Sequence, residues 1–201
     1  MTLFDFHDGL GPVPAHEHVN PDGKLGGWVA DTAQVSAQAM VEKRARVAGM
    51  AKVLDQAEIW GQARIVDNAI IRDHAKIRGL AVVGGNATVG GYAWVRGGAI
   101  IQGSALVTDD VDVYDDAFID GSAKIYGLAK VGEHARVLDN AEIGGKAVIG
   151  GHAVMAGNVK CRTERVIDGI RMGRRRKVKR GGGISPDDIL VLLELDGSIG
   201  I

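Results

Sequence analysis

The chain has 201 residues, of which 46% are hydrophobic but only 4% aromatic, so any core must be built mainly from Val, Ile and Ala. Its formal net charge of −1 excludes a global electrostatic bias toward nucleic acid or anionic membranes. A lone cysteine, Cys161, excludes an internal disulfide framework, and no run approaches the roughly 20 apolar residues of a membrane helix. The first residues lack the features of a secretory signal, so we expect a cytoplasmic protein.

Residues 1–28 precede any regular repeat and are rich in glycine, proline and histidine. We expect them to form a largely irregular N-terminal cap over the solenoid described next. Within this cap, Leu25 and Trp28 are the apolar residues expected to close the open end of the core.

A six-residue repeat runs without interruption from Val29 to Cys161. In most hexads an Ala lies two residues before a Val or Ile, and a Gly or Asp lies two residues after it. Residues two apart on a strand share a face, so the Ala and the Val or Ile should point inward together. Gly and Asp tolerate positive φ, which lets the chain turn a corner after each short strand. The repeat therefore predicts an all-β solenoid over residues 29–161, with the handedness left open by the spacing alone.

These hexads resemble those of the left-handed β-helix, hexapeptide-repeat superfamily, whose best-known members are acyltransferases. The resemblance implies a single-stranded, left-handed parallel β-helix over residues 29–161, in which three hexads form one triangular coil and about seven coils stack. It also implies a homotrimer. The opening segment is similar to one found in uncharacterised bacterial and phage hexapeptide proteins, which carries no known activity. Superfamily acyltransferases typically interrupt the coil with an extruded loop, whereas the register here never slips.

Residues 162–201 leave the repeat. The Asp168-Gly169 pair favours a type I′ turn and predicts a small hairpin over residues 163–172. A basic segment follows, and Ser185-Pro186 has the features of a helix start. We therefore expect a short helix that ends near Leu195.

Residues separated by three hexads should stack on adjacent coils, and one such stack brings His134 and His152 to the same corner. In an acyltransferase of this fold, either histidine is a candidate general base. Asp115, Asp116, Glu133 and His134 are weak candidates for a metal site, although no closed set of metal ligands is predicted. Polar residues are also ordinary at solvent-facing corners, which explains the same cluster without any chemistry.

One outward face carries an apolar stripe, which is unusual for a monomer and predicts an oligomer interface. Cover by the N-terminal segment or the C-terminal tail is the alternative. The predicted interface residues are Val66, Val82, Ile100, Phe118, Leu138 and Val154.

A second outward face combines aromatic and basic side chains. Such residues are enriched in protein interfaces and can also stack against sugars or bases. The predicted binding residues on this face are Trp60, Arg78, Trp94, Arg96 and Tyr114.

The segment from Arg174 to Arg180 carries six positive charges in seven residues. Its Arg174, Arg175, Arg176 and Lys177 are candidate contacts for nucleic acid or an acidic partner. A solvated linker, or one docked on the acidic side chains around residues 109–120 of the solenoid, would have the same composition.

Together these features favour a non-catalytic protein without a cofactor that self-assembles, most simply as a homotrimer, and presents a surface for another protein. An acyltransferase that uses acetyl-CoA is one alternative. A phage or bacterial accessory protein that binds and blocks a host macromolecule is another. A membrane is not among the expected partners.

Overall fold

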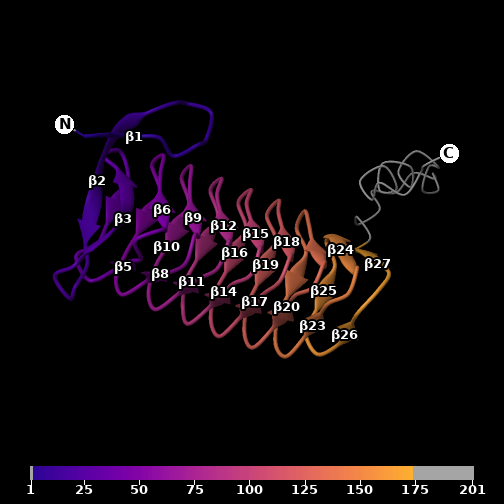
Figure 1. Cartoon of the computed structure of the whole chain (residues 1–201). Coiled ribbons are helices and arrows are strands. Elements are labelled where there is room, and N and C mark those ends of the chain that lie inside the picture. The colour runs from indigo at the N-terminus through magenta and orange to yellow at the C-terminus, as the bar shows by residue number, and fades with distance from the viewer. Residues whose placement is uncertain (1, 174–201) are drawn as a thin grey trace.

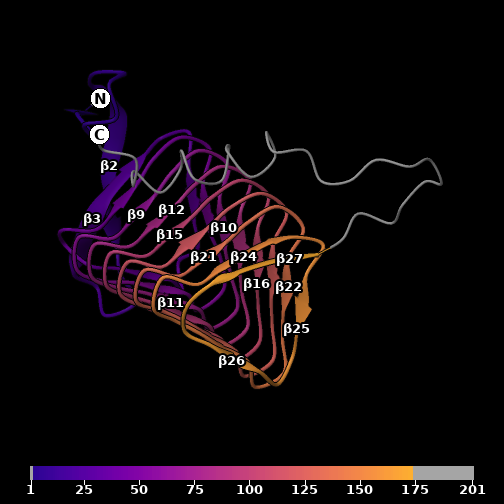
Figure 2. The same ribbon diagram turned by 90° about the vertical axis from the view of Figure 1, so that its right-hand side faces the viewer.

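The computed structural model describes residues 2–173, which form an all-β parallel solenoid of about eight turns (Figure 1). Viewed from the end, the stacked coils have a roughly triangular outline (Figure 2). Each coil contributes one short strand to each of three sheets. No helix occurs in residues 2–173, and hence none that could span a membrane.

The first sheet has eleven strands and the second and third have eight each. The first sheet consists of β1 (Leu3–Phe4), β2 (Val13–Val19), β3 (Leu25–Ala30), β6 (Arg46–Val47), β9 (Arg64–Ile65), β12 (Val82–Val83), β15 (Ile100–Ile101), β18 (Phe118–Ile119), β21 (Arg136–Val137), β24 (Val154–Gly157) and β27 (Ile170–Gly173). The second consists of β4 (Gln34–Val35), β7 (Lys52–Val53), β10 (Ile70–Ile71), β13 (Thr88–Val89), β16 (Leu106–Val107), β19 (Lys124–Ile125), β22 (Glu142–Ile143) and β25 (Lys160–Cys161). The third consists of β5 (Met40–Val41), β8 (Glu58–Ile59), β11 (Lys76–Ile77), β14 (Trp94–Val95), β17 (Asp112–Val113), β20 (Lys130–Val131), β23 (Val148–Ile149) and β26 (Arg165–Val166).

The hexad places its small and branched side chains inside the coils. The Ala and the Val or Ile of each strand are buried from Ala39 to Ala153, and they form one continuous core. Strands pair three hexads apart, as Val83 does with Ile101, so equivalent residues stack along the axis. Ala33 and Val35 are only partly buried, because no coil precedes them. The predicted parallel solenoid is confirmed.

The geometry of the corners explains why a Gly or an Asp follows most strands. The first residue of a corner commonly has positive φ, +74° at Gly97 and +61° at Asp73. A Cβ at Gly97 would lie 2.8 Å from backbone atoms of Asp115 on the next coil. Asp73 tolerates the conformation and adds a contact, because its Oδ2 accepts a 2.8 Å hydrogen bond from the Gly91 N–H one coil later. Corner carboxylates therefore tie successive coils together along the axis.

The N-terminal cap is more regular than expected. Strand β2 pairs antiparallel with both β1 and β3, which extends the first sheet beyond the first coil. Leu25 is 56% exposed and does not close the core. Trp28 stacks on Phe4, with ring centroids 4.4 Å apart, and belongs to a small second core outside the coil. The prediction of an irregular cap closed by Leu25 and Trp28 was wrong. The register of β2 shifts between Glu17 and Val19, so its buried residues, Ala15 and His18, do not follow the alternation typical of a strand.

Two polar side chains complete the first edge of the third sheet. The Nε2–H of buried His18 donates to the carbonyl of Ala39 at 3.0 Å. The amide of Asn20 donates to the carbonyl of Val41 at 3.1 Å and accepts from its N–H at 2.8 Å. These backbone groups lie at the edge strand β5, so the two side chains replace the strand that a preceding coil would supply.

The C-terminal hairpin prediction was wrong. Residues 163–173 add another length of coil, in which β26 pairs parallel with β23 and β27 pairs parallel with β24. Val148 pairs with Arg165, a single residue short of three hexads, and Val154 pairs with Ile170, a further residue short. Single residues are therefore missing at two places, and these deletions hid the continuing repeat. Asp168-Gly169 forms a corner rather than a hairpin turn. The predicted short helix lies outside the described residues.

Candidate functional site

The aromatic and basic residues predicted on one face do lie together on the outer surface of the third sheet. They come from β8, β11, β14 and β17 and from the residues that directly follow these strands. We call this surface the aromatic wall. It comprises Glu58, Trp60, Lys76, Arg78, Trp94, Arg96, Asp112 and Tyr114.

Arg78 is the central contact of the aromatic wall. Its guanidinium carbon lies 4.7 Å from the centroid of a Trp94 ring and 5.7 Å from that of Trp60. The Lys76 ammonium lies 5.7 Å from the Trp94 ring, which is itself 40% exposed. Cations at these distances are attracted by the indole π-systems, by about 0.5–1 kcal/mol each at exposed sites. The contacts hold an exposed indole in a fixed orientation.

Glu58 neutralises part of the positive charge around the two indoles. Its carboxylate accepts hydrogen bonds from the indole N–H of Trp60 at 2.8 Å and lies 3.0 Å from the Lys76 ammonium. Partial burial opposes ionisation of Glu58, but the hydrogen bonds from Lys76 and Trp60 outweigh that effect, and its pKa is lowered. Glu58 is therefore a charged anchor that orients Trp60 and Lys76.

Arg96 makes the second fixed contact of the wall. Its Nε and one terminal nitrogen donate to the two carboxylate oxygens of Asp112 at 3.1 and 2.9 Å, and this bidentate pair raises the pKa of Arg96. The guanidinium also lies 5.1 Å from the Tyr114 ring. That ring covers Gly132, where a Cβ would lie 2.1 Å from ring atoms. Burial is the main cause of the raised pKa of the Tyr114 hydroxyl.

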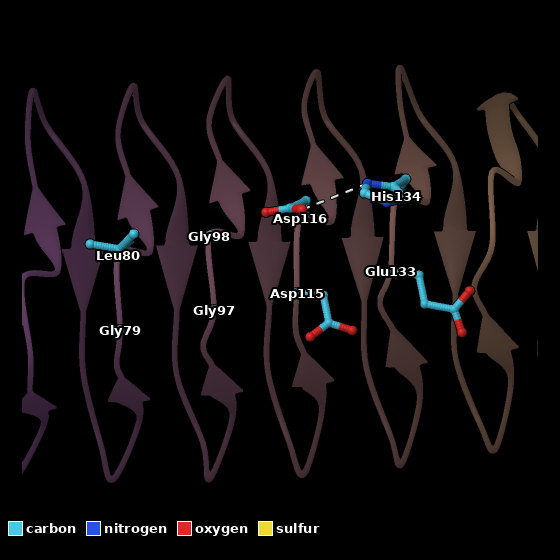
Figure 3. A pocket seen from close by; sticks show the side chains of 8 residues that line it. All are labelled: Gly79, Leu80, Gly97, Gly98, Asp115, Asp116, Glu133 and His134. Carbon is cyan, nitrogen blue, oxygen red and sulfur yellow. Dashed lines mark ion pairs between the residues drawn. The ribbon is translucent and has the colours of Figure 1, made fainter.

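A shallow groove runs along the corner that follows the third sheet (Figure 3). Figure 3 shows Asp116 facing His134 across neighbouring coils, while Asp115 and Glu133 project away from this pair. The Glu133 carboxylate accepts a hydrogen bond from the Gly151 N–H and so links two successive coils. Within residues 2–173, no group of three or more His, Cys, Asp or Glu side chains could hold a metal ion. The weak metal site at Asp115, Asp116, Glu133 and His134 therefore has no geometric support.

The two candidate general bases stack on each other at this corner. The ring centroids of His134 and His152 are 5.1 Å apart. His134 Nδ1 lies 3.7 Å from Asp116 Oδ2, and His152 Nδ1 lies 3.9 Å from Asp168 Oδ1. All four side chains are largely exposed. Each histidine thus has a carboxylate partner, but both face solvent rather than an enclosed substrate site.

The apolar stripe divides into two columns on the first sheet. Val82, Ile100 and Phe118 stack in direct register, and Arg136 rather than Val154 follows Phe118, with its guanidinium 5.3 Å from the phenyl ring. Val66 and Leu138 lie in the neighbouring column, just after β9 and β21. Val66 packs against the second core formed with the N-terminal segment, so part of the stripe is covered within the chain. The apolar column formed by Val82, Ile100 and Phe118 is the part that stacks without interruption.

Arg174, Arg175, Arg176 and Lys177 lie outside the described residues. Three residues that the sequence reasoning did not select, Glu58, Asp112 and Asp168, hold predicted site residues in place. Glu58 pairs in register with Lys76, and Asp112 pairs in register with Trp94. The spacing of three hexads in the sequence could therefore have identified both acidic residues. Asp168 could not be found in this way, because the deletions shift its register.

Comparison with known proteins gives few matches. No protein-family model and no curated protein sequence matches the chain. Among solved structures, the X-ray crystal structure of a provisionally assigned acetyltransferase from Bacillus cereus is 18% identical with a TM-score of 0.41, over 75% of this chain and 90% of that one. Similarity at this level transfers no activity, and the strand pairing defines the fold by itself. The chain is a hexapeptide-repeat parallel β-solenoid, the type of fold that the resemblance of its hexads implies.

Proposed function

We propose that the protein is a non-catalytic scaffold that self-assembles, as a homotrimer, through the first sheet and binds another protein through the aromatic wall. The observation that carries the proposal is that two faces of one solenoid differ in their side chains. One face has an uninterrupted apolar column, and another has aromatic and basic side chains held in fixed positions.

The apolar column supports self-association. Ile100 is 37% exposed at its centre, with Val82 and Phe118 stacked on the coils before and after it. Removing apolar surface from water stabilises an interface by about 25 cal/mol per Å² before the costs of association. A second copy is the occupant proposed here, because the resemblance of the hexads implies a three-fold assembly.

The aromatic wall supports binding of a different protein. Trp, Tyr and Arg are the residues that most often dominate binding energy at interfaces. Here Arg78 is held against two indoles, and Arg96 against Asp112 and Tyr114. Side chains that are already ordered lose less conformational entropy on binding, which favours affinity.

Sedimentation velocity on surface variants tests the assembly. Ile100→Asp places a charge in the apolar column and should shift the protein to the mass of a single chain. Leu106→Asp makes the same change at the outward position of β16 on the second sheet and should leave the mass unchanged. Trp94→Ala should also leave it unchanged, because the wall is assigned to another partner. Equal masses for Ile100→Asp and Leu106→Asp would show that the first sheet is not the interface.

The acyltransferase remains the second candidate, because His134 and His152 each lie near a carboxylate, as a general base often does. Titration with acetyl-CoA in a calorimeter distinguishes the two functions. The scaffold predicts no heat of binding. Binding of acetyl-CoA by the wild-type protein would favour the enzyme.

A further inference from the structure

His134 and His152 occupy the same corner position on consecutive coils, three hexads apart in the chain. Their rings are stacked, with centroids 5.1 Å apart and planes inclined by 26°. Their side chains are 59% and 78% exposed, so an ion can reach them from solvent and the rings can reorient at little cost. The solenoid thus holds two imidazoles side by side on a rigid backbone.

A carboxylate lies beyond each ring. Asp116 is on the coil before His134, with Oδ2 3.7 Å from Nδ1, and Asp168 is on the coil after His152, with Oδ1 3.9 Å from Nδ1. Asp168 is held in place because its Oδ1 also accepts the backbone N–H of His152 at 3.2 Å. A carboxylate near Nδ1 favours the tautomer that is protonated there and leaves a lone pair on Nε2. Metal-binding histidines characteristically have carboxylates in this second position.

We propose that His134 and His152 chelate one divalent transition-metal ion of the Cu²⁺, Ni²⁺ and Zn²⁺ class through their Nε2 atoms, with water in the remaining positions. Metal–nitrogen bonds of about 2.0–2.1 Å place two imidazole donors up to about 4 Å apart, close to the ~4.8 Å spacing of neighbouring strands. Imidazole suits these three ions, and the affinities should follow the order in which Cu²⁺ binds most tightly. The site is an open pair of ligands, distinct from the closed clusters of three or more that residues 2–173 lack.

The surrounding charge favours a cation. Asp116 and Asp168 face the two rings, and Asp115 and Glu133 lie at the same corner, directly before Asp116 and His134 in the chain. Their combined negative potential raises the local concentration of a divalent ion.

Isothermal titration of the intact protein with CuCl₂, NiCl₂ and ZnCl₂ tests the proposal. The matched control is His74→Ala, because His74 lies at a different corner, where its ring stacks on Tyr92 at 4.9 Å rather than on another histidine. Wild type and His74→Ala should bind with the same affinity. His134→Ala and His152→Ala should each weaken binding on the order of 10²-fold, because either change removes the second point of attachment. Asp168→Asn should weaken it by about ten-fold, the lower end of the effect of such partners.

A second measurement locates the ion independently of affinity. Substoichiometric Cu²⁺ should broaden the amide NMR signals of residues near His134 and His152 before those near His16 in the N-terminal segment. Wild-type affinity in either His134→Ala or His152→Ala would overturn the site. Broadening confined to the N-terminal segment would overturn it as well, as would the absence of binding by wild type.

Discussion

Asp73 accepts a hydrogen bond of 2.8 Å from the backbone N–H of Gly91, one coil further along the solenoid. The N–H of Asp73 itself donates to Asp55 Oδ2 at 3.0 Å, so the same contact repeats between three coils. Carboxylates that look like an acidic surface in the sequence are therefore part of the axial bonding of the fold.

Replacing Asp73 tests its backbone conformation and its axial hydrogen bond together. Asp73→Ala should lower the free energy of unfolding by about 2–3 kcal/mol, because it combines a left-handed backbone cost of about 1–2 kcal/mol with the loss of a hydrogen bond worth about 1 kcal/mol. Asp73→Asn keeps a side chain that tolerates positive φ and an acceptor oxygen, so it should cost less than half as much. Urea unfolding followed by circular dichroism measures both. Equal losses for Ala and Asn would show that neither the tolerance of positive φ nor the axial hydrogen bond at this position stabilises the fold.

Gly97 should be difficult to replace at its corner. Its φ is +74°, and an added Cβ would lie 2.8 Å from the backbone of Asp115. Gly169 has a φ of +94° with no atom within 4 Å of the Cβ position, so Gly169→Ala carries the backbone strain without the clash. Gly97→Ala should therefore lower the melting temperature clearly more than Gly169→Ala. The reverse order would contradict the close stacking of corners.

The contribution of Glu58 to stability should depend on pH. Its pKa is lowered in the folded protein, so it stabilises the fold above its usual value of 4.5, and this stabilisation is lost as the pH falls through the lower folded value. Glu58→Gln should therefore be less stable than wild type at pH 7, and the difference should shrink as the pH falls below 4.5 and through the lower folded pKa. Urea midpoints measured at neutral pH and at a series of acidic pH values test this. If the stability difference between wild type and Glu58→Gln stays constant with pH, the charge of Glu58 is not its cause.

Cys161 reports on the last coils. Its side chain lies in the core at 3% exposure, and burial raises the pKa of the thiol. Ellman's reagent should therefore react with the native protein far more slowly than with the protein in urea. Immediate modification without denaturant would show that the core is open at β25.

The sequence predicts the inward positions well because the three-hexad period repeats each environment on every coil. Ile101 and Ile119 are buried for the same reason, and either could be assigned from the other. That regularity fails at the ends. The register is short by one residue at two places, which hid β26 and β27 and made this segment look like a hairpin. Strand β2 was missed because its register shifts between Glu17 and Val19, so its buried residues do not alternate.

The outward surfaces were predictable in composition but only partly in geometry. The spacing of three hexads is enough to place Trp94 beside Lys76, and the two residues do pair directly. The closer contact between Arg78 and Trp94 is diagonal and depends on side-chain conformation. In the same way, the predicted apolar stripe joined residues of two columns. Val66 lies in the column next to that of Ile100, and the N-terminal segment packs on it. Local contacts of this kind have no periodic signal.

The mass of the wild-type protein in solution tests the central claim most directly. Size-exclusion chromatography with light scattering, at micromolar concentration, should give about three times the chain mass of 21.1 kDa. A mass of 21.1 kDa under those conditions would contradict the self-assembling scaffold.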